Sequence, residues 1–111
     1  MTNEEQVNAF LREARKRIEN EQYDFIYDDM LKLTDLGIAI TEAINIVKNL
    51  KLEDYYRGPK KDHLHPEQEV YEFGKWLDEI ELYIKLTIRK QDDLFIMSFH
   101  EAKRPINYPY K

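Results

Sequence analysis

Apolar side chains recur at a spacing of three or four residues through the first half of the chain, which is the period of an amphipathic helix. The first stripe predicts a helix over residues 3–20, and a second predicts one over residues 24–36, with Gly37 as its C-cap. Thr41 is expected to cap a third, shorter helix. Residues 1–51 are therefore predicted to be the helical part of the protein.

The period changes to two after residue 51, which indicates strands. From residue 80 to residue 88 every even position is apolar, so one face of this strand is expected to be buried and the odd positions share the other. A second strand is predicted over residues 94–100, after a hairpin loop at 90–93, and a third over residues 69–75. The sequence thus predicts an α+β domain in which three N-terminal helices pack on a small antiparallel sheet within residues 52–101.

Length and composition fit a single folded domain. The 111 residues, 42% of them hydrophobic and 13% aromatic, can build one packed core and are too few for two. Two segments fall outside the helices and the sheet: residues 58–66 are predicted as a polar loop, and residues 102–111 as a basic C-terminal tail. The polar N-terminus and the lack of a long apolar run predict neither a signal peptide nor a transmembrane helix, so we expect a cytoplasmic protein without a membrane partner.

Charge and residue usage exclude several classes of function. The net charge is −5, and the first 55 residues hold 7 Lys and Arg against 12 Asp and Glu, whereas the rest hold 10 of each. No basic field covers the whole domain, which argues against avid, sequence-blind binding of nucleic acid. The absence of cysteine removes disulfides, thiol nucleophiles and cysteine-ligated metals, and 3 glycines leave no glycine-rich loop for phosphate.

A short histidine pair is the best candidate for a metal site. His63 and His65 alternate beside Asp62, and alternate residues of an extended segment project to one side. A catalytic zinc needs three protein ligands held by further hydrogen bonds, and no second set of ligands stands out. We therefore expect a solvated loop here, with no metal and no cofactor.

The polar face of the strand at residues 80–88 is more informative. Tyr83 and Lys85 lie two residues apart on it, and His100 ends the neighbouring strand, where alternation puts it on the face of Ser98 and Ile96. An imidazole can give or take a proton at neutral pH, and a cation can stabilise a pentavalent phosphorane. These groups suit RNA cleavage by the 2′-hydroxyl without a metal. The alternative is that they are ordinary exposed strand residues.

Five short motifs occur together, in the order and approximate spacing of one family. They lie at residues 36–37, 52–57, 68–71, 82–86 and 97–101. Over residues 33–101 the chain resembles the MqsR family of type II toxins. The resemblance implies a RelE-like ribonuclease fold of three helices against an antiparallel sheet. It also implies cleavage of messenger RNA and inhibition by a cognate antitoxin protein, and it leaves open whether the ribosome takes part.

The resemblance also implies roles for single residues. Gln68 and Tyr83 match active-site residues of the family, and its better-known members carry lysine where this chain has Arg57 and His100. We predict that Tyr83 and His100 share the proton transfers and that Arg57 and Lys85 hold the scissile phosphate. Four further side chains are expected to contact the substrate through hydrogen bonds, charge or stacking on a base, namely Gln68, Lys60, Lys61 and Tyr56.

A second hypothesis comes from the uneven charge. The acidic helical half is a surface that fits a basic partner, so the fold could hold a protein or an RNA without cutting it. A stoichiometric complex without cleavage products would favour this non-catalytic binding module over the ribonuclease.

Overall fold

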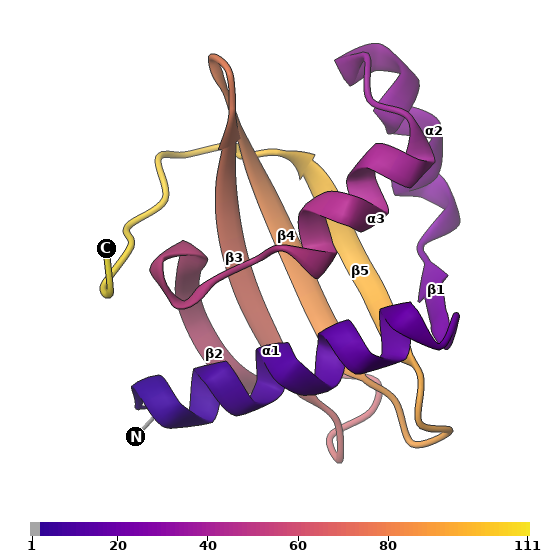
Figure 1. Ribbon diagram of the computed structural model, residues 1–111, viewed down its shortest axis with the longest axis vertical. Helices are drawn as coiled ribbons and strands as arrows, with labels where there is room; N and C mark the ends of the chain where they lie inside the picture. Colours follow the sequence, from indigo (N-terminus) through magenta and orange to yellow (C-terminus); the bar gives the residue numbers. More distant parts are fainter. Residues whose placement is uncertain (1–2) are drawn as a thin grey trace.

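The helices come first in the chain, and most of the sheet follows them (Figure 1). The computed structural model describes residues 3–111, which contain three α-helices, a turn of 3-10 helix and five strands. The helical elements are α1 (Glu4–Glu19), α2 (Tyr27–Leu36), α3 (Ile40–Lys48) and the 3-10 turn η1 (Leu52–Asp54). The strands are β1 (Tyr23–Phe25), β2 (Tyr55–Lys61), β3 (Glu69–Leu77), β4 (Ile80–Ile88) and β5 (Leu94–Glu101). The α+β class predicted from the sequence is confirmed.

The five strands form one mixed sheet in the order β1-β5-β4-β3-β2. Strands β2 to β5 pair antiparallel, but β1 pairs parallel with β5, so the prediction of a purely antiparallel sheet is wrong. The backbone of β1 and of the residue after it forms hydrogen bonds with β5. For example, the Ile26 N–H donates to the Ile96 carbonyl at 3.0 Å. For the same reason the predicted helix start at residue 24 is wrong, and α2 begins at Tyr27.

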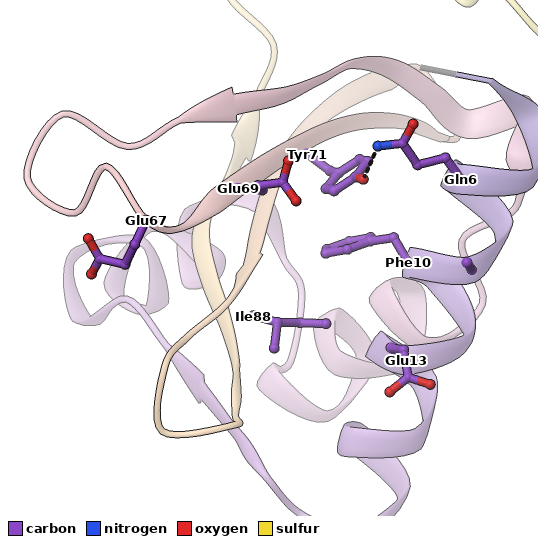
Figure 2. A pocket seen from close by; sticks show the side chains of 8 residues that line it. Gln6, Phe10, Glu13, Glu67, Glu69, Tyr71 and Ile88 are labelled. Atoms are coloured by element: carbon purple, nitrogen blue, oxygen red, sulfur yellow. Dashed lines mark hydrogen bonds between the residues drawn. The ribbon is translucent and has the colours of Figure 1, made fainter. Parts of the chain in front are cut away.

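Helix α1 lies across one face of the sheet (Figure 1). Its N-cap is Asn3, whose side-chain oxygen accepts from the Gln6 backbone N–H at 2.8 Å and so satisfies one of the unpaired donors of the first turn. Its apolar stripe is buried, and the Phe10 ring stacks on Tyr71 of β3 with 4.1 Å between ring centroids (Figure 2). Aromatic stacking and burial of this stripe therefore fix α1 against the sheet.

The short helices follow the predicted order with one change. Gly37 caps α2 with a left-handed φ of 71°, as predicted, because only glycine adopts this conformation without cost. Helix α3 begins at Ile40, and Ala39 in extended backbone is its N-cap without a side-chain hydrogen bond. Thr41 thus lies inside the first turn and is not the cap that the sequence predicted.

Strand β2 includes residues that the sequence predicted as loop. Gly58–Lys61 continue the strand, so only residues from 62 onward connect it to β3. Proline is compatible with this position because β2 is an edge strand, and the pairing with β3 shifts register between Arg57 and Lys60. Gly58 has φ 118°, and a Cβ there would lie 2.6 Å from the Val70 carbonyl oxygen, so a larger residue does not fit.

The face of the sheet opposite α1 carries the odd positions of β4. Even positions such as Leu82, Ile84 and Leu86 are fully buried in the core, as the alternation predicts. The odd position Thr87 departs from it, since it is also fully buried and its hydroxyl donates to the Glu69 carbonyl at 2.8 Å. We call the opposite side, with Glu81, Tyr83 and Lys85, the outer face. It is partly covered by the C-terminal segment.

Residues 102–111 run from the end of β5 back toward β2 (Figure 1). The Tyr108 hydroxyl donates to Glu81 Oε2 at 2.7 Å, and the Ile106 N–H donates to Glu81 Oε1 at 3.1 Å. Both residues also approach Gly74 of β3 closely, since a Cβ on this glycine would lie 2.4 Å from the Tyr108 hydroxyl oxygen. The segment predicted as a tail is thus packed on the outer face.

Candidate functional site

A cavity of about 400 Å³ opens on the outer face between the strands and the C-terminal segment. None of the described residues that line it is acidic, although 22 of the 111 residues are Asp or Glu. Its wall from the strands consists of Tyr56, Arg57, Tyr83, Lys85, Ser98 and His100, and its wall from the C-terminal segment consists of residues 102–106. The cavity therefore joins an imidazole, phenols and cations on one surface.

A buried carboxylate, Glu72 of β3, binds two of the side chains that line this cavity. It accepts a hydrogen bond from the Tyr83 hydroxyl at 2.9 Å and another from Arg57 Nε, and Lys60 Nζ lies 4.0 Å away. Only 5% of its side chain is exposed. Glu72 was not among the residues predicted from the sequence, although its place in the alternation of residues 69–75 puts it on the polar face opposite Lys85.

The phenol of Tyr83 is held in its protonated form. Burial raises the pKa of Tyr83 well above its usual range, and the hydrogen bond to Glu72 and the charge of this carboxylate raise it further. The Tyr83 hydroxyl is therefore a hydrogen-bond donor at neutral pH and begins any reaction as an acid.

His100 lies directly beside Tyr83. The two residues are register partners across β4 and β5, and their ring centroids are 5.3 Å apart, as pairing through the short hairpin predicts. His100 Nδ1 is 2.9 Å from the Glu101 carbonyl oxygen. Since a carbonyl oxygen only accepts, we assign the proton of the neutral ring to Nδ1, which leaves Nε2 as the proton acceptor.

The cations of the cavity differ in how they are paired. Arg57 is bound to Glu72, and its guanidinium also lies 4.7 Å from the centre of the Tyr56 ring. Within residues 3–111, no carboxylate forms an ion pair with Lys85, Lys103 or Arg104, which also line the cavity. The positive charge that is free to meet an anion here comes from these three side chains.

The structure brings together most of the residues predicted for the site. Tyr56, Arg57, Tyr83, Lys85 and His100 all line the cavity. Three predicted substrate contacts lie outside it: Lys60 and Lys61 line an adjoining hollow of about 190 Å³ that shares Lys85 with the cavity, and Gln68 is buried at the end of the β2–β3 loop.

Another cavity of similar size lies on the α1 side of the sheet (Figure 2). The stacked rings of Phe10 and Tyr71 form part of its wall, and its charged residues are Glu13, Glu67 and Glu69. Three carboxylates repel a polyanion, so electrostatics favours the outer-face cavity for a phosphate ligand. The described residues contain no cluster of three or more His, Asp or Glu side chains arranged to hold a metal, and Asp62, His63 and His65 form none.

Comparison with known protein families gives one match that covers most of the chain. Residues 5–101 match the family described as motility quorum-sensing regulator, toxin of MqsA. The chain belongs to the MqsR toxin family. It is accordingly a toxin of a toxin–antitoxin system, and the family implies an antitoxin partner. No curated protein matches the sequence.

The MqsR family match covers every strand residue of the cavity and ends at residue 101, where β5 ends. The wall formed by residues 102–106 lies beyond the matched part. Among the described residues of this MqsR-family protein, no helix is long and apolar enough to cross a membrane.

Proposed function

We propose that this MqsR-family toxin is an endoribonuclease that cleaves messenger RNA in the cytoplasm by attack of a ribose 2′-hydroxyl on the adjacent phosphate, without a metal. The observation that carries the proposal is a cavity that joins a histidine, a protonated tyrosine and free cations and has no acidic residue in its lining. The mixed sheet with α1 on one face would then be a RelE-like scaffold for this site.

The proton transfers follow from the two rings. His100 Nε2 takes the proton of the 2′-hydroxyl, and the 2′-oxygen forms a bond to phosphorus. The bond from phosphorus to the 5′-oxygen breaks, and Tyr83 supplies the proton that this oxygen needs. The products are a 2′,3′-cyclic phosphate and a 5′-hydroxyl. Tyr83 can act as the acid because it begins protonated, and the positive charge of Arg57 favours the phenolate that it becomes.

The charges support the same reaction. The pentavalent transition state carries more negative charge on its oxygens than the substrate does, so preorganised cations stabilise it preferentially. Lys85 is the register neighbour of Glu72 and lines the cavity without an ion-pair partner among the described residues. Arg57 is held by Glu72 and presents its remaining N–H donors to a phosphate.

Expression in bacteria without a neighbouring antitoxin gene tests the proposal. The wild type should arrest growth and create new 5′ ends in total RNA, and His100→Ala should do neither. His65→Ala is the matched control, since this histidine is exposed on the β2–β3 loop and lines none of the cavities described above. If well-folded wild-type protein leaves growth and RNA intact, the ribonuclease proposal fails and the binding module predicted from the acidic half takes its place.

A further inference from the structure

The C-terminal segment, which lies outside the family match, supplies much of the outer-face cavity. Residues 102–106 form one wall, and two of the three cavity cations without an ion-pair partner in the described chain, Lys103 and Arg104, belong to it. Lys103 also lines a neighbouring hollow of about 280 Å³ together with His100 and Lys32 of α2. That hollow also contains the carboxylates of Asp35 and Glu101, so its charges balance, and the excess of positive charge from this segment lies in the outer-face cavity.

The segment is fixed on the sheet by several contacts. Glu81, only 9% exposed, accepts hydrogen bonds from Tyr108 and Ile106 with both of its carboxylate oxygens. The Ala102 N–H donates to the Glu81 carbonyl at 2.7 Å, and the Tyr110 ring lies 5.4 Å from that of Tyr55. These contacts hold residues 103 and 104 between two anchors, beside His100.

The absence of a side chain at Gly74 makes this docking fit. A Cβ at Gly74 would lie 2.4 Å from the Tyr108 hydroxyl oxygen and 2.6 Å from Ile106 Cδ1, both closer than packed atoms approach. The conformation of Gly74 is not left-handed, so alanine is compatible with its backbone. Alanine at this position therefore pushes the segment away without removing any of its charges.

We propose that residues 102–111 form a phosphate-binding arm, in which Lys103 and Arg104 bind the RNA phosphates that flank the scissile one. This inference rests on the proposed ribonuclease function and names how its substrate is held. Because these cations contact phosphates other than the reacting one, the arm contributes to the affinity for RNA. Glu81 and Tyr108 are positioning residues, which keep the arm on the sheet.

The test is RNA affinity as a function of salt, measured by fluorescence anisotropy with a random-sequence single-stranded RNA on the non-cleaving His100→Ala protein. Each phosphate contact contributes about 0.7 to the slope of log affinity against log salt for single strands. The double variant Lys103→Gln/Arg104→Gln should therefore lower the slope by about 1.4. Its loss of affinity relative to the parent protein should consequently be about 25-fold larger at about 0.1 M salt than at about 1 M salt. The control Arg12→Gln/Lys16→Gln removes the same charge from exposed positions of α1 and should leave the slope nearly unchanged.

Gly74→Ala separates the position of the arm from its charge. It should weaken RNA binding in the otherwise intact chain, and it should have no further effect when Lys103 and Arg104 are already replaced. Equal losses in the α1 control, an unchanged slope in the arm variant, or no RNA binding by any variant would overturn the arm. With His100 restored, cleavage by the arm variant should show a raised KM. Failure of the proposed function is distinct, since the wild type would then bind RNA and not cut it.

Discussion

Glu72→Gln is the substitution that probes the architecture of the site most sharply. The amide keeps the shape of the side chain, and its oxygen still accepts from the Tyr83 hydroxyl, but the negative charge is lost. A hydrogen bond to a charged group contributes about 1.5–3 kcal/mol and a neutral one about 1 kcal/mol, so this contact loses about 1 kcal/mol. The Arg57 side chain is 48% exposed, so solvent screening leaves its ion pair worth less than about 1 kcal/mol.

The loss is offset in part because glutamine carries no buried charge to desolvate. We expect the free energy of unfolding to fall by about 1 kcal/mol, which for a domain of this size lowers the Tm by about 4–8 °C. Thermal unfolding followed by circular dichroism measures this. The control is Glu69→Gln, which removes the same charge from an exposed position of β3.

Glu72→Gln lowers stability, but it should make RNA binding more dependent on salt. Loss of the carboxylate leaves the positive charge of Arg57 without a neutralising partner, so the salt slope of RNA affinity should steepen by about 0.7. Cleavage should slow, because Tyr83 and Arg57 are no longer held in place. If Glu72→Gln melts with the wild type and keeps its salt slope, then this carboxylate neither holds Tyr83 nor neutralises Arg57, and the account of the site is wrong.

Three further predictions concern stability. Phe10→Ala should cost about 3–5 kcal/mol in urea unfolding, because it removes a buried ring stacked on β3, and a loss below about 1 kcal/mol would contradict the packing of α1. The raised pKa values of Tyr83 and Tyr108 favour the neutral phenols in the fold, so their contribution is complete below about pH 10 and is lost as the pH rises further. Burial raises the pKa of Tyr71 as well. Alkaline titration of tyrosine absorbance should therefore show three late phenols, one of them missing in Tyr108→Phe. A hydrogen bond from Arg89 lowers the pKa of Asp93, so its contribution is present above about pH 4 and is lost as the pH falls through the lowered value. Urea unfolding of Asp93→Asn should consequently depend less on pH in this range than that of the wild type.

Local sequence patterns correctly predicted the features that depend only on the residue types within an element. The even positions of β4 and the apolar stripe of α1 face the core, and Gly37 ends α2, because period and capping follow from residue types alone. Strand β1 was missed since its three residues gain their hydrogen bonds from β5, about seventy positions along the chain. Such non-local pairing leaves no period in the sequence.

The site was predicted in part for similar reasons. Alternation correctly joined Tyr83 to His100, but it also placed Ile96 on their face, and a register shift in β5 after Ile96 instead buries this residue completely. Glu72 was missed because a glutamate in a strand is ordinarily solvated, and only the neighbouring Arg57 shows why this one is buried. The docking of residues 102–111 depends on the bare backbone of Gly74, which the sequence alone does not reveal.

The proposed metal-independent ribonuclease activity is tested by incubating the purified protein with single-stranded RNA in the presence of a chelator. We expect fragments that end in a 2′,3′-cyclic phosphate and begin with a 5′-hydroxyl. Cleavage should be lost in His100→Ala and when the ribose at the cut position lacks its 2′-hydroxyl. Intact RNA, or cleavage that requires a metal and leaves a 5′-phosphate, would contradict this proposal.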